Sequence, residues 1–242
     1  MIYLFTDFGS GDIYVGQVKA RLARSAPGIP IIDLLHDAPA FDVRASAHLL
    51  SALAAEQPQG SVTLAVIDPG VGTSRKPVVV RVGEAWFVGP DNGLLSVLVA
   101  RSRDAAVYEI TWRPRSMSRS FHGRDLFAPI AGRIAASGVA EDSIEPAVGL
   151  EVALDAADLG EFIYIDHYGN ALTGLRGSAP DTERLLWIHE RAVRFASVFA
   201  EAAPNEPIWY VNSIGLIEVA VNRGSAAKEL GLSVGDAVQW SR

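Results

Sequence analysis

Short apolar runs alternate with stretches of helical period along the first hundred residues. The apolar runs, which are typical of buried strands, are Ile2–Phe5, Ile29–Leu35 and Val62–Ile67. After the first run, Val15, Val18 and Leu22 recur at helical spacing, and an Ala- and Leu-rich helix is predicted over about 42–55. Strands and helices that alternate in this way favour a mainly parallel sheet covered by helices.

A hairpin and two further helices are predicted beyond residue 77. Val78–Val82 and Trp86–Val88 flank the turn at Gly83, which is the pattern of two antiparallel strands. The two helices are predicted over about 94–98 and 125–136. Residues 140–158 lose any clear period, and we expect the domain boundary there, between an α/β domain over 1–150 and a second domain over 160–242.

The apolar period changes to two in the second half of the chain. Five short alternating segments follow one another, at 162–165, 185–188, 208–211, 216–221 and 237–240. Short strands separated by glycine turns predict a small antiparallel barrel or sandwich. The stretch 191–203 fits either a strand with a short helix or a single helix.

Composition narrows the classes of function. The 242 residues are 49% hydrophobic, carry a formal charge of −7 and include no cysteine. Disulfides, thiolate metal sites and cysteine nucleophiles are therefore excluded, and the acidic balance argues against nucleic acid as a partner. The apolar run at 2–5 is too short for a signal peptide, and no run approaches the length of a membrane span. We expect a soluble cytoplasmic protein.

Acidic residues stand at or near the ends of the first three predicted strands, at Asp7, Asp33 and Asp68. Ligands of open α/β sheets bind at the carboxyl edge, where such side chains gather. After Asp68 come a proline and two glycines, which turn the chain so that Arg75 can return toward the carboxylate. A purely structural ion pair fits the same pattern. Asp7 is placed to bind the two hydroxyls of a ribose.

Other polar residues of the first half have simpler explanations. Asp12 and Asp42 precede predicted helices, and we expect both to be helix caps. The glycines at 9 and 11 complete no dinucleotide fingerprint and no Walker A sequence is present, so a phosphate cradle is not supported.

A second candidate cluster lies at residues 120–125. His122 precedes a glycine at the entrance of a predicted helix, among the side chains of Arg124 and Asp125. These neighbours distinguish His122 from His36, His48 and His189, which we interpret as structural. Arg124 and Asp125 themselves fit a cap and an ion pair as well as they fit a site.

Several separate motifs together resemble one family. The chain is similar to the S-adenosyl-L-methionine (SAM) hydrolases, also called SAM hydroxide adenosyltransferases, which are relatives of the bacterial fluorinase and chlorinase. The motifs, in order, are Thr6-Asp7-Phe8-Gly9 with Asp12 and Tyr14-Val15-Gly16, Asp33-Leu34-Leu35-His36, Phe41-Asp42-Val43, Ile67-Asp68-Pro69-Gly70-Val71-Gly72, Gly89-Pro90-Asp91-Asn92-Gly93, Phe121-His122-Gly123-Arg124-Asp125, Ile165-Asp166-His167-Tyr168-Gly169-Asn170 and Asn212-Ser213 with Gly215. Each motif alone is weak, whereas the ordered set over nearly the whole chain is specific.

The resemblance implies hydrolysis of SAM to adenosine and L-methionine, with SAM as substrate and neither cofactor nor metal. It also implies an N-terminal α/β domain, a C-terminal β-barrel and a homotrimer with the site at the subunit interface. The family's catalytic set matches Asp68, Arg75 and His122. The substrate contacts that it implies are Asp7 for the ribose, Phe41 and Phe121 around the substrate, Asp166 for the methionine amino group, Asn170 for adenine and Ser213 for the methionine carboxylate.

The sequence departs from the family pattern at some positions, and alternatives to SAM hydrolysis remain open. Thr173-Gly174 stands where relatives commonly have Thr-Asn, and Ile214 stands where the fluorinase has an arginine for the methionine carboxylate. Halide transfer to the same carbon is the near alternative, although Val71 and Gly123 supply no hydroxyl where the fluorinase holds its halide. A non-catalytic SAM- or adenosine-binding module and a metal-dependent hydrolase using Asp7, Asp68 and His122 are the more distant ones.

Overall fold

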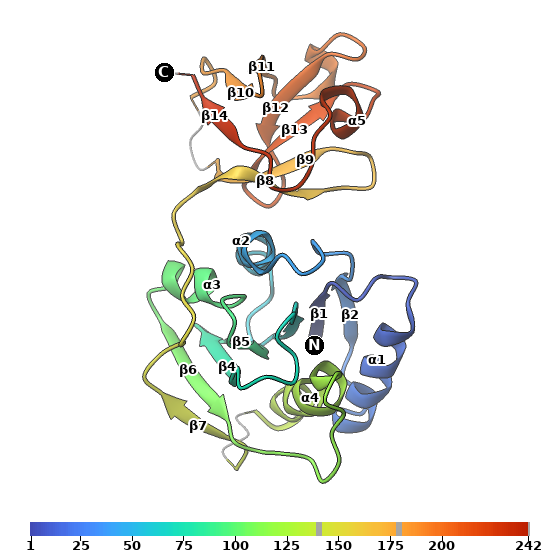
Figure 1. The fold of residues 1–242 in the computed structure, drawn as a ribbon, viewed down its shortest axis with the longest axis vertical. Helices are drawn as coiled ribbons and strands as arrows, with labels where there is room; N and C mark the ends of the chain where they lie inside the picture. Colours follow the sequence, from blue (N-terminus) through green and yellow to red (C-terminus); the bar gives the residue numbers. More distant parts are fainter. Residues whose placement is uncertain (139–141, 178–180, 242) are drawn as a thin grey trace. The chain divides into compact units, whose positions relative to one another are not determined.

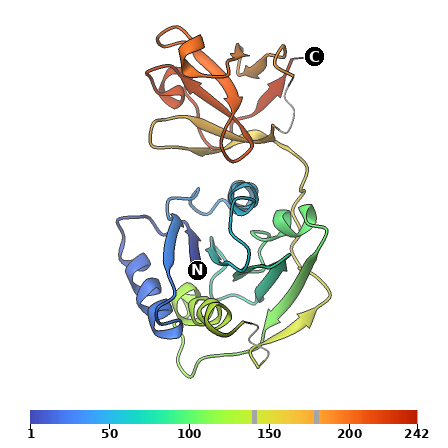
Figure 2. The ribbon, with the colours of Figure 1, turned by 180° about the vertical axis from the view of Figure 1, so that it is seen from behind.

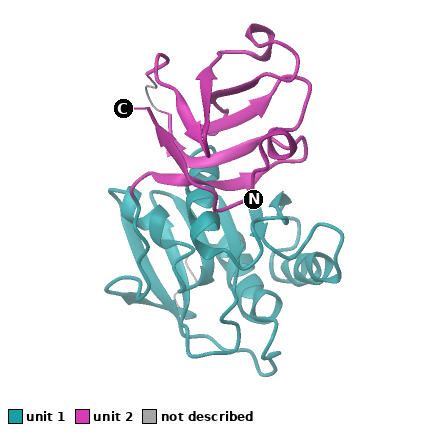
Figure 3. Ribbon diagram, turned by 45° about the horizontal axis from the view of Figure 1, so that its top comes forward, with its two compact units in different colours: residues 1–156 teal, residues 157–242 magenta. Residues whose placement is uncertain are grey.

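The computed structural model describes residues 1–138, 142–177 and 181–241 (Figure 1). The chain forms two compact units, residues 1–156 and 157–242, which are coloured separately in Figure 3. Each unit contains a seven-stranded sheet. Within the described residues, no helix has the length and apolar character needed to cross a bilayer.

The sheet of the first unit is mixed. Its strands are β1 (Ile2–Thr6), β2 (Ile31–Leu35), β3 (Val62–Val66), β4 (Pro77–Val82), β5 (Ala85–Pro90), β6 (Ala105–Ile110) and β7 (Ile144–Ala147). They lie in the order β2-β1-β3-β5-β4-β6-β7, so that β2 and β7 form the two edges (Figure 2). The pairs β1–β2, β1–β3 and β3–β5 are parallel, and the pairs β4–β5, β4–β6 and β6–β7 are antiparallel.

The prediction of a mainly parallel sheet was therefore wrong. The hairpin at Gly83 is confirmed, and its short turn forces β4 to run against β5. Strands β6 and β7 then add to β4 in antiparallel fashion. No strand was predicted at β6 or β7, because β6 mixes alanine and glutamate with its apolar residues and β7 contains Pro146. Such an edge strand tolerates proline because it needs fewer ladder hydrogen bonds.

Helices cover both faces of this sheet. They are α1 (Ile13–Ser25), α2 (Val43–Ala54), α3 (Ser96–Arg101) and α4 (Ala128–Ser137), the last preceded by a π-helical turn over Gly123–Phe127. Connections between parallel strands are right-handed, so the step from β1 outward to β2 and the step back to β3 place α1 and α2 on opposite faces. Buried residues of α1 and α4 share one core with alternate positions of β1 and β3. The expected caps are confirmed: Asp12 accepts from the N–H of Ile13, and Asp42 from that of Ala45.

The second unit is an almost closed barrel. Its strands are β8 (Leu159–Ile165), β9 (Ala171–Arg176), β10 (Leu186–Ile188), β11 (Arg191–Phe195), β12 (Pro207–Val211), β13 (Leu216–Val221) and β14 (Val238–Trp240), in the order β14-β10-β11-β12-β13-β9-β8. An antiparallel bridge between Glu161 and Ala237 links the two ends of the sheet. A short helix, α5 (Ala226–Leu230), packs on the same core, which is centred on Trp209.

One pair of barrel strands contradicts the expected antiparallel arrangement. Strands β11 and β12 are parallel. The connection between them contains a 3-10 helix, Phe199–Glu201, and is long enough to bring the chain back to the starting end before β12 begins. The ambiguous stretch 191–203 is thus a strand followed by a short helix.

Alanine substitutions at two helical glycines are expected to change the free energy of unfolding in opposite directions. A Cβ at Gly132 in α4 would lie 2.4 Å from the Cβ of Ser25 at the end of α1, whereas a Cβ at Gly16 in α1 would meet nothing within 4 Å. Gly16→Ala is expected to stabilise the protein by up to about 1 kcal/mol through helix propensity. Gly132→Ala is expected to destabilise it by roughly 1–3 kcal/mol through overpacking. Denaturant unfolding measures both free energies, and a Gly132→Ala protein as stable as Gly16→Ala would contradict the close α1–α4 packing.

Candidate active site

The loop after β3 carries an acid and brings an arginine back to it. Asp68 follows the buried Ile67 at the carboxyl end of the strand. Arg75 donates from Nε to Oδ1 of Asp68 at 2.9 Å and from Nη2 to Oδ2, a bidentate pair. Gly72 lies in the left-handed region, with φ 81°, and a Cβ there would lie 2.6 Å from the carbonyl oxygen of Arg119. The loop therefore needs glycine at this position both for its turn and for its contact with the next segment.

His122 completes a buried cluster with this pair. It stands just before the π-helical turn that leads into α4, and its Nδ1 lies 2.9 Å from Nη2 of Arg75. The exposed fraction is 5% for the Asp68 side chain, 9% for that of Arg75 and 8% for His122, so all three are withdrawn from bulk water. Two side chains of one loop thus meet a third that lies 47 residues beyond Arg75 in the sequence.

The Arg75 contact determines which nitrogen of His122 carries hydrogen. A guanidinium can only donate, so Nδ1 must accept and Nε2 carries the hydrogen of the neutral ring. Burial lowers the pKa of His122 from its ordinary value, and the neighbouring Arg75 charge lowers that pKa further. The ring is therefore held neutral, as a hydrogen-bond donor at Nε2.

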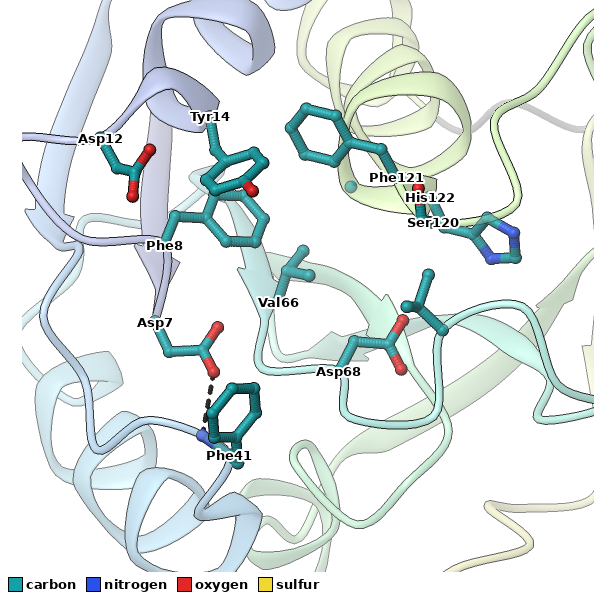
Figure 4. A pocket seen from close by; sticks show the side chains of 12 residues that line it. Asp7, Phe8, Asp12, Tyr14, Phe41, Val66, Asp68, Ser120, Phe121 and His122 are labelled. Atoms are coloured by element: carbon teal, nitrogen blue, oxygen red, sulfur yellow. Dashed lines mark hydrogen bonds between the residues drawn. The ribbon is translucent and has the colours of Figure 1, made fainter.

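Asp68 and His122 face a cavity of about 370 Å³ in the first unit (Figure 4). Its lining residues are Asp7, Phe8, Asp12, Tyr14, Phe41, Val66, Asp68, Val71, Ser120, Phe121, His122 and Gly123. Figure 4 shows the carboxylates of Asp7 and Asp68 on facing sides of the cavity, with Val66 between them. The two acids follow the adjacent parallel strands β1 and β3, in which Thr6 pairs with Val66.

Asp7 is held by the backbone of the loop before α2. Its Oδ2 accepts from the N–H of Phe41 at 3.0 Å. Phe41 has φ 62°, a strained conformation for a phenylalanine, and its side chain is 75% exposed. Burial raises the pKa of Asp7, the Phe41 hydrogen bond lowers that pKa, and the Asp68 charge raises it. Strained backbone that holds a half-buried acid is common at functional sites.

Three aromatic rings form the apolar side of the cavity. Phe8, Tyr14 and Phe121 lie with ring centroids 5.4–6.0 Å apart. Arg124 lies over the Phe121 ring at 5.0 Å. Phe121 was expected here, whereas Phe8 and Tyr14 were not. The sequence signal that could have indicated Phe8 and Tyr14 is their position on either side of the glycine turn that precedes α1.

Other polar residues singled out in the first unit have structural partners. The third strand-end acid, Asp33, bonds to Lys19 and His36 rather than lining the cavity. Asp125 accepts from Arg124, whose hydrogen bonds lower its pKa to about 2. Among the described residues, no group of three His, Asp or Glu side chains is arranged to hold a metal ion.

Two further histidines likewise have structural contacts. His48 lies 3.3 Å from Arg101, and His189 lies 3.8 Å from Asp236. Neither residue lines the cavity.

The candidate residues of the second unit lie in two turns. Asp166 and Asn170 share the turn between β8 and β9, where Oδ2 of Asp166 accepts from Nδ2 of Asn170 at 3.0 Å. Ser213 is exposed in the turn between β12 and β13. This turn is at the other end of the β9–β13 pairing, beyond Leu216 and Arg176. The fold thus brings Asp166 and Asn170 together and leaves Ser213 apart from them within this unit.

Comparison with known proteins gives matches over both units. Residues 2–144 match the SAM hydroxide adenosyltransferase N-terminal domain and residues 160–239 the SAM hydroxide adenosyltransferase C-terminal domain. An (R)-S-adenosyl-L-methionine hydrolase from Thermus thermophilus is 40% identical, with 98% of each chain covered. A fluorinase from Nocardia brasiliensis is 24% identical, with 99% of this chain and 96% of the fluorinase covered.

A solved structure from Thermotoga maritima, described as an uncharacterized conserved protein, is also similar. It superposes with a TM-score of 0.91 at 31% identity, with 100% of each chain covered. With both domains matched in order, the chain belongs to the SAM hydroxide adenosyltransferase family.

Proposed function

We propose that this protein hydrolyses SAM to adenosine and L-methionine. The observation that carries the proposal is the buried cluster of Asp68, Arg75 and His122, two of whose members face a cavity beside a ribose-binding acid candidate. The name of the Thermus thermophilus relative, a SAM hydrolase that matches along 98% of both chains, supports the same reaction.

The substrate simplifies the chemistry that is required. Water attacks the ribose 5′ carbon, a C–O bond forms, and the C–S bond breaks with its electron pair left on sulfur. The leaving methionine is a neutral thioether, so it needs no proton from a general acid and no metal to stabilise an anion. One proton is released from the attacking water. The protein has to hold that water in line with the breaking C–S bond, and it has to accept the proton of the water or polarise its O–H bond.

Asp68 is the group suited to accept from the water. Each of its oxygens takes one hydrogen bond from Arg75 and keeps a further lone pair. His122 is not suited to this role, because its Nδ1 lone pair accepts from Arg75 and its Nε2 carries hydrogen. We assign His122 the role of orienting Arg75 and donating to the water oxygen. Polarising a positioned water in this way contributes typically about 10²- to 10⁴-fold.

Substrate contacts follow from the cavity and from the family. Asp7 would bind the ribose hydroxyls, and Phe41 and Phe121 would contact the substrate around them. Asp166, Asn170 and Ser213 would contact the amino group, adenine and carboxylate of SAM. The protein would act as a homotrimer, with each site at a subunit interface and without cofactor or metal. Ile214 replaces the fluorinase arginine, so another group must pair with the methionine carboxylate.

Halide transfer is the alternative that the site disfavours. The carboxylate of Asp68 would repel an incoming anion. Val71 and Gly123 offer no hydroxyl, and a Cβ at Gly123 would lie 3.0 Å from the Phe8 ring, which leaves no room for a serine without movement. A protein that binds SAM or adenosine without turnover would have the same cavity. Only an activity assay distinguishes such a binding module from an enzyme.

Purified protein incubated with SAM is expected to form adenosine and methionine in equal amounts, with one proton released per turnover. Liquid chromatography measures both products, and a pH indicator in weak buffer measures the proton. Parallel reactions with fluoride and chloride are expected to give no 5′-halogenated adenosine. Binding of SAM without products would contradict the enzyme, and a halogenated product would support the halogenase instead.

Asp68→Asn is expected to lower turnover by at least ~10²-fold, because it replaces the charged, basic carboxylate with a neutral amide that cannot take the proton of the water. Asp33→Asn is the matched control: it makes the same change at another strand end, outside the cavity, and turnover should stay within about twofold. SAM affinity, measured by calorimetry, should persist in the Asp68 variant. Normal turnover of Asp68→Asn would remove Asp68 from the mechanism.

The acid limb of kcat/KM is expected to lie below pH 6.5. The pKa of His122 is lowered from its ordinary value of 6.5, so the ring stays neutral until the pH falls below that value. Protonation would then remove the acceptor of Arg75 and place two cations together. Stability linked to His122 is likewise present above pH 6.5 and is lost as the pH falls through the lowered pKa.

His122→Asn separates this group from Asp7, which can also titrate on the acid side. The asparagine keeps an acceptor near the Nδ1 position, so it should retain more turnover than His122→Ala. Any acid limb that remains in the asparagine variant belongs to another group. A wild-type midpoint above pH 6.5 would be inconsistent with the neutral ring.

A further inference from the structure

A second cavity borders the same cluster. It has a volume of about 620 Å³ and is lined by Gly72, Thr73, Ser74, Arg75, Lys76, Pro77, Glu109, Arg113, Met117, Arg119, His122 and Leu126. His122 lines both cavities, whereas Asp68 lines only the first and Arg75 only the second. The cluster therefore forms part of the wall between the substrate cavity and this second space.

The second cavity is basic although the chain as a whole is acidic. Four Arg and Lys side chains line it against a single carboxylate, that of Glu109. Lys76 already pairs with Glu109 and Glu151, at 3.0 Å each. Arg113 donates Nη1 only to the backbone carbonyls of Ile110 and Trp112.

The Arg119 side chain has no hydrogen bond or ion pair within the described part of the chain. Two guanidinium charges of this cavity, on Arg113 and Arg119, are thus not balanced by carboxylates.

Arg75 adds an available donor to this space. Its Nε and Nη2 hold Asp68 and His122, and its Nη1 has no partner among the residues that the structure describes. Its side chain is only 9% exposed and borders the second cavity. Nη1 is not one of the buried side-chain atoms that lack a partner in the described residues, so it reaches solvent and is available to an acceptor in the cavity.

We propose that the second cavity binds an oxyanion of the phosphate class, held by Arg75 Nη1, Arg113 and Arg119. Planar guanidinium groups match the paired oxygens of such anions better than they match a spherical halide. Ser74 lines the same space, and its hydroxyl has no partner in the described residues. Inorganic phosphate and the phosphate group of an ester present the same oxygens to these donors.

The site is separate from the substrate cavity, so oxyanion and nucleoside bind together rather than in competition. A negative charge beside His122 favours the protonated ring. A bound oxyanion therefore shifts the acid limb of hydrolysis to higher pH and slows turnover near that limb. Only this consequence rests on the proposed function; binding of the oxyanion does not.

Calorimetric titration of the full chain with inorganic phosphate, at constant ionic strength, tests the site. Saturable binding is expected, and it should persist when adenosine saturates the substrate cavity. Glycerol phosphate in a parallel titration distinguishes an ester from the free ion as the better ligand. Arg119→Gln should weaken phosphate binding about tenfold, since a charge-assisted contact is lost.

Arg115→Gln is the matched control, because it removes the same charge from the same exposed segment without lining the cavity. Its phosphate affinity should stay within about twofold of the wild type. Equal weakening in both variants would show a diffuse charge effect and overturn the site. Absence of saturable binding, or displacement of phosphate by adenosine, would overturn it as well.

Sedimentation of each variant completes the test. If wild-type protein binds no phosphate and Arg119→Gln alters subunit assembly, Arg119 serves a carboxylate of a second copy, and the proposal fails. If the wild-type protein binds phosphate but does not hydrolyse SAM, the result counts against the proposed function and not against the oxyanion site.

Discussion

The bidentate pairing of Arg75 with Asp68, closed by the contact of Arg75 with His122, is the interaction on which the site depends. Taking a carboxylate and a guanidinium out of water is costly unless their hydrogen-bonding groups are well matched. Here one planar guanidinium serves both oxygens of the acid and one nitrogen of the ring. A lysine has the same charge but no rigid fork, so it could not fix the two partners relative to each other.

The parallel half of the first sheet explains where the cluster lies. Strands β1 and β3 are adjacent and in register, so Asp7 and Asp68 leave the same edge of the sheet. His122 comes from a separate segment, just before the π-helical turn that leads into α4, and α4 shares a core with β1 and β3. The antiparallel half begins at Pro77, just after Arg75, so the loop with the cluster lies where the sheet changes direction.

Charge is distributed unevenly around this point. The cavity proposed for the substrate is bounded by acids and aromatic rings, which suits a cationic sulfonium beside a sugar. The second cavity is bounded by arginines and lysine. Arg75 is shared between the two environments: its Nε and Nη2 hold the acid and the ring, and its side chain lines the basic cavity. His122 lines the second cavity too, so a change in charge there would act on the ring directly as well as through Arg75.

The sequence by itself determined the alternation of strands and helices, the hairpin at Gly83, the helix caps at Asp12 and Asp42, and the family. These features depend on local periodicity, turn chemistry and ordered motifs, which are all visible along the chain. It also indicated Asp68, Arg75 and His122 as candidate site residues, although a purely structural ion pair between Asp68 and Arg75 fitted the same sequence pattern. Only the tertiary structure decided that both sheets are mixed, because strand direction depends on which neighbours pair.

The tertiary structure also decided which nitrogen of His122 is free. It placed Phe8 and Tyr14 in the cavity wall, and it placed Arg75 at the border of the second cavity. Each of these is a relation between side chains brought together from distant segments. Periodicity along the chain carries no information about such contacts, since they are fixed by packing between elements.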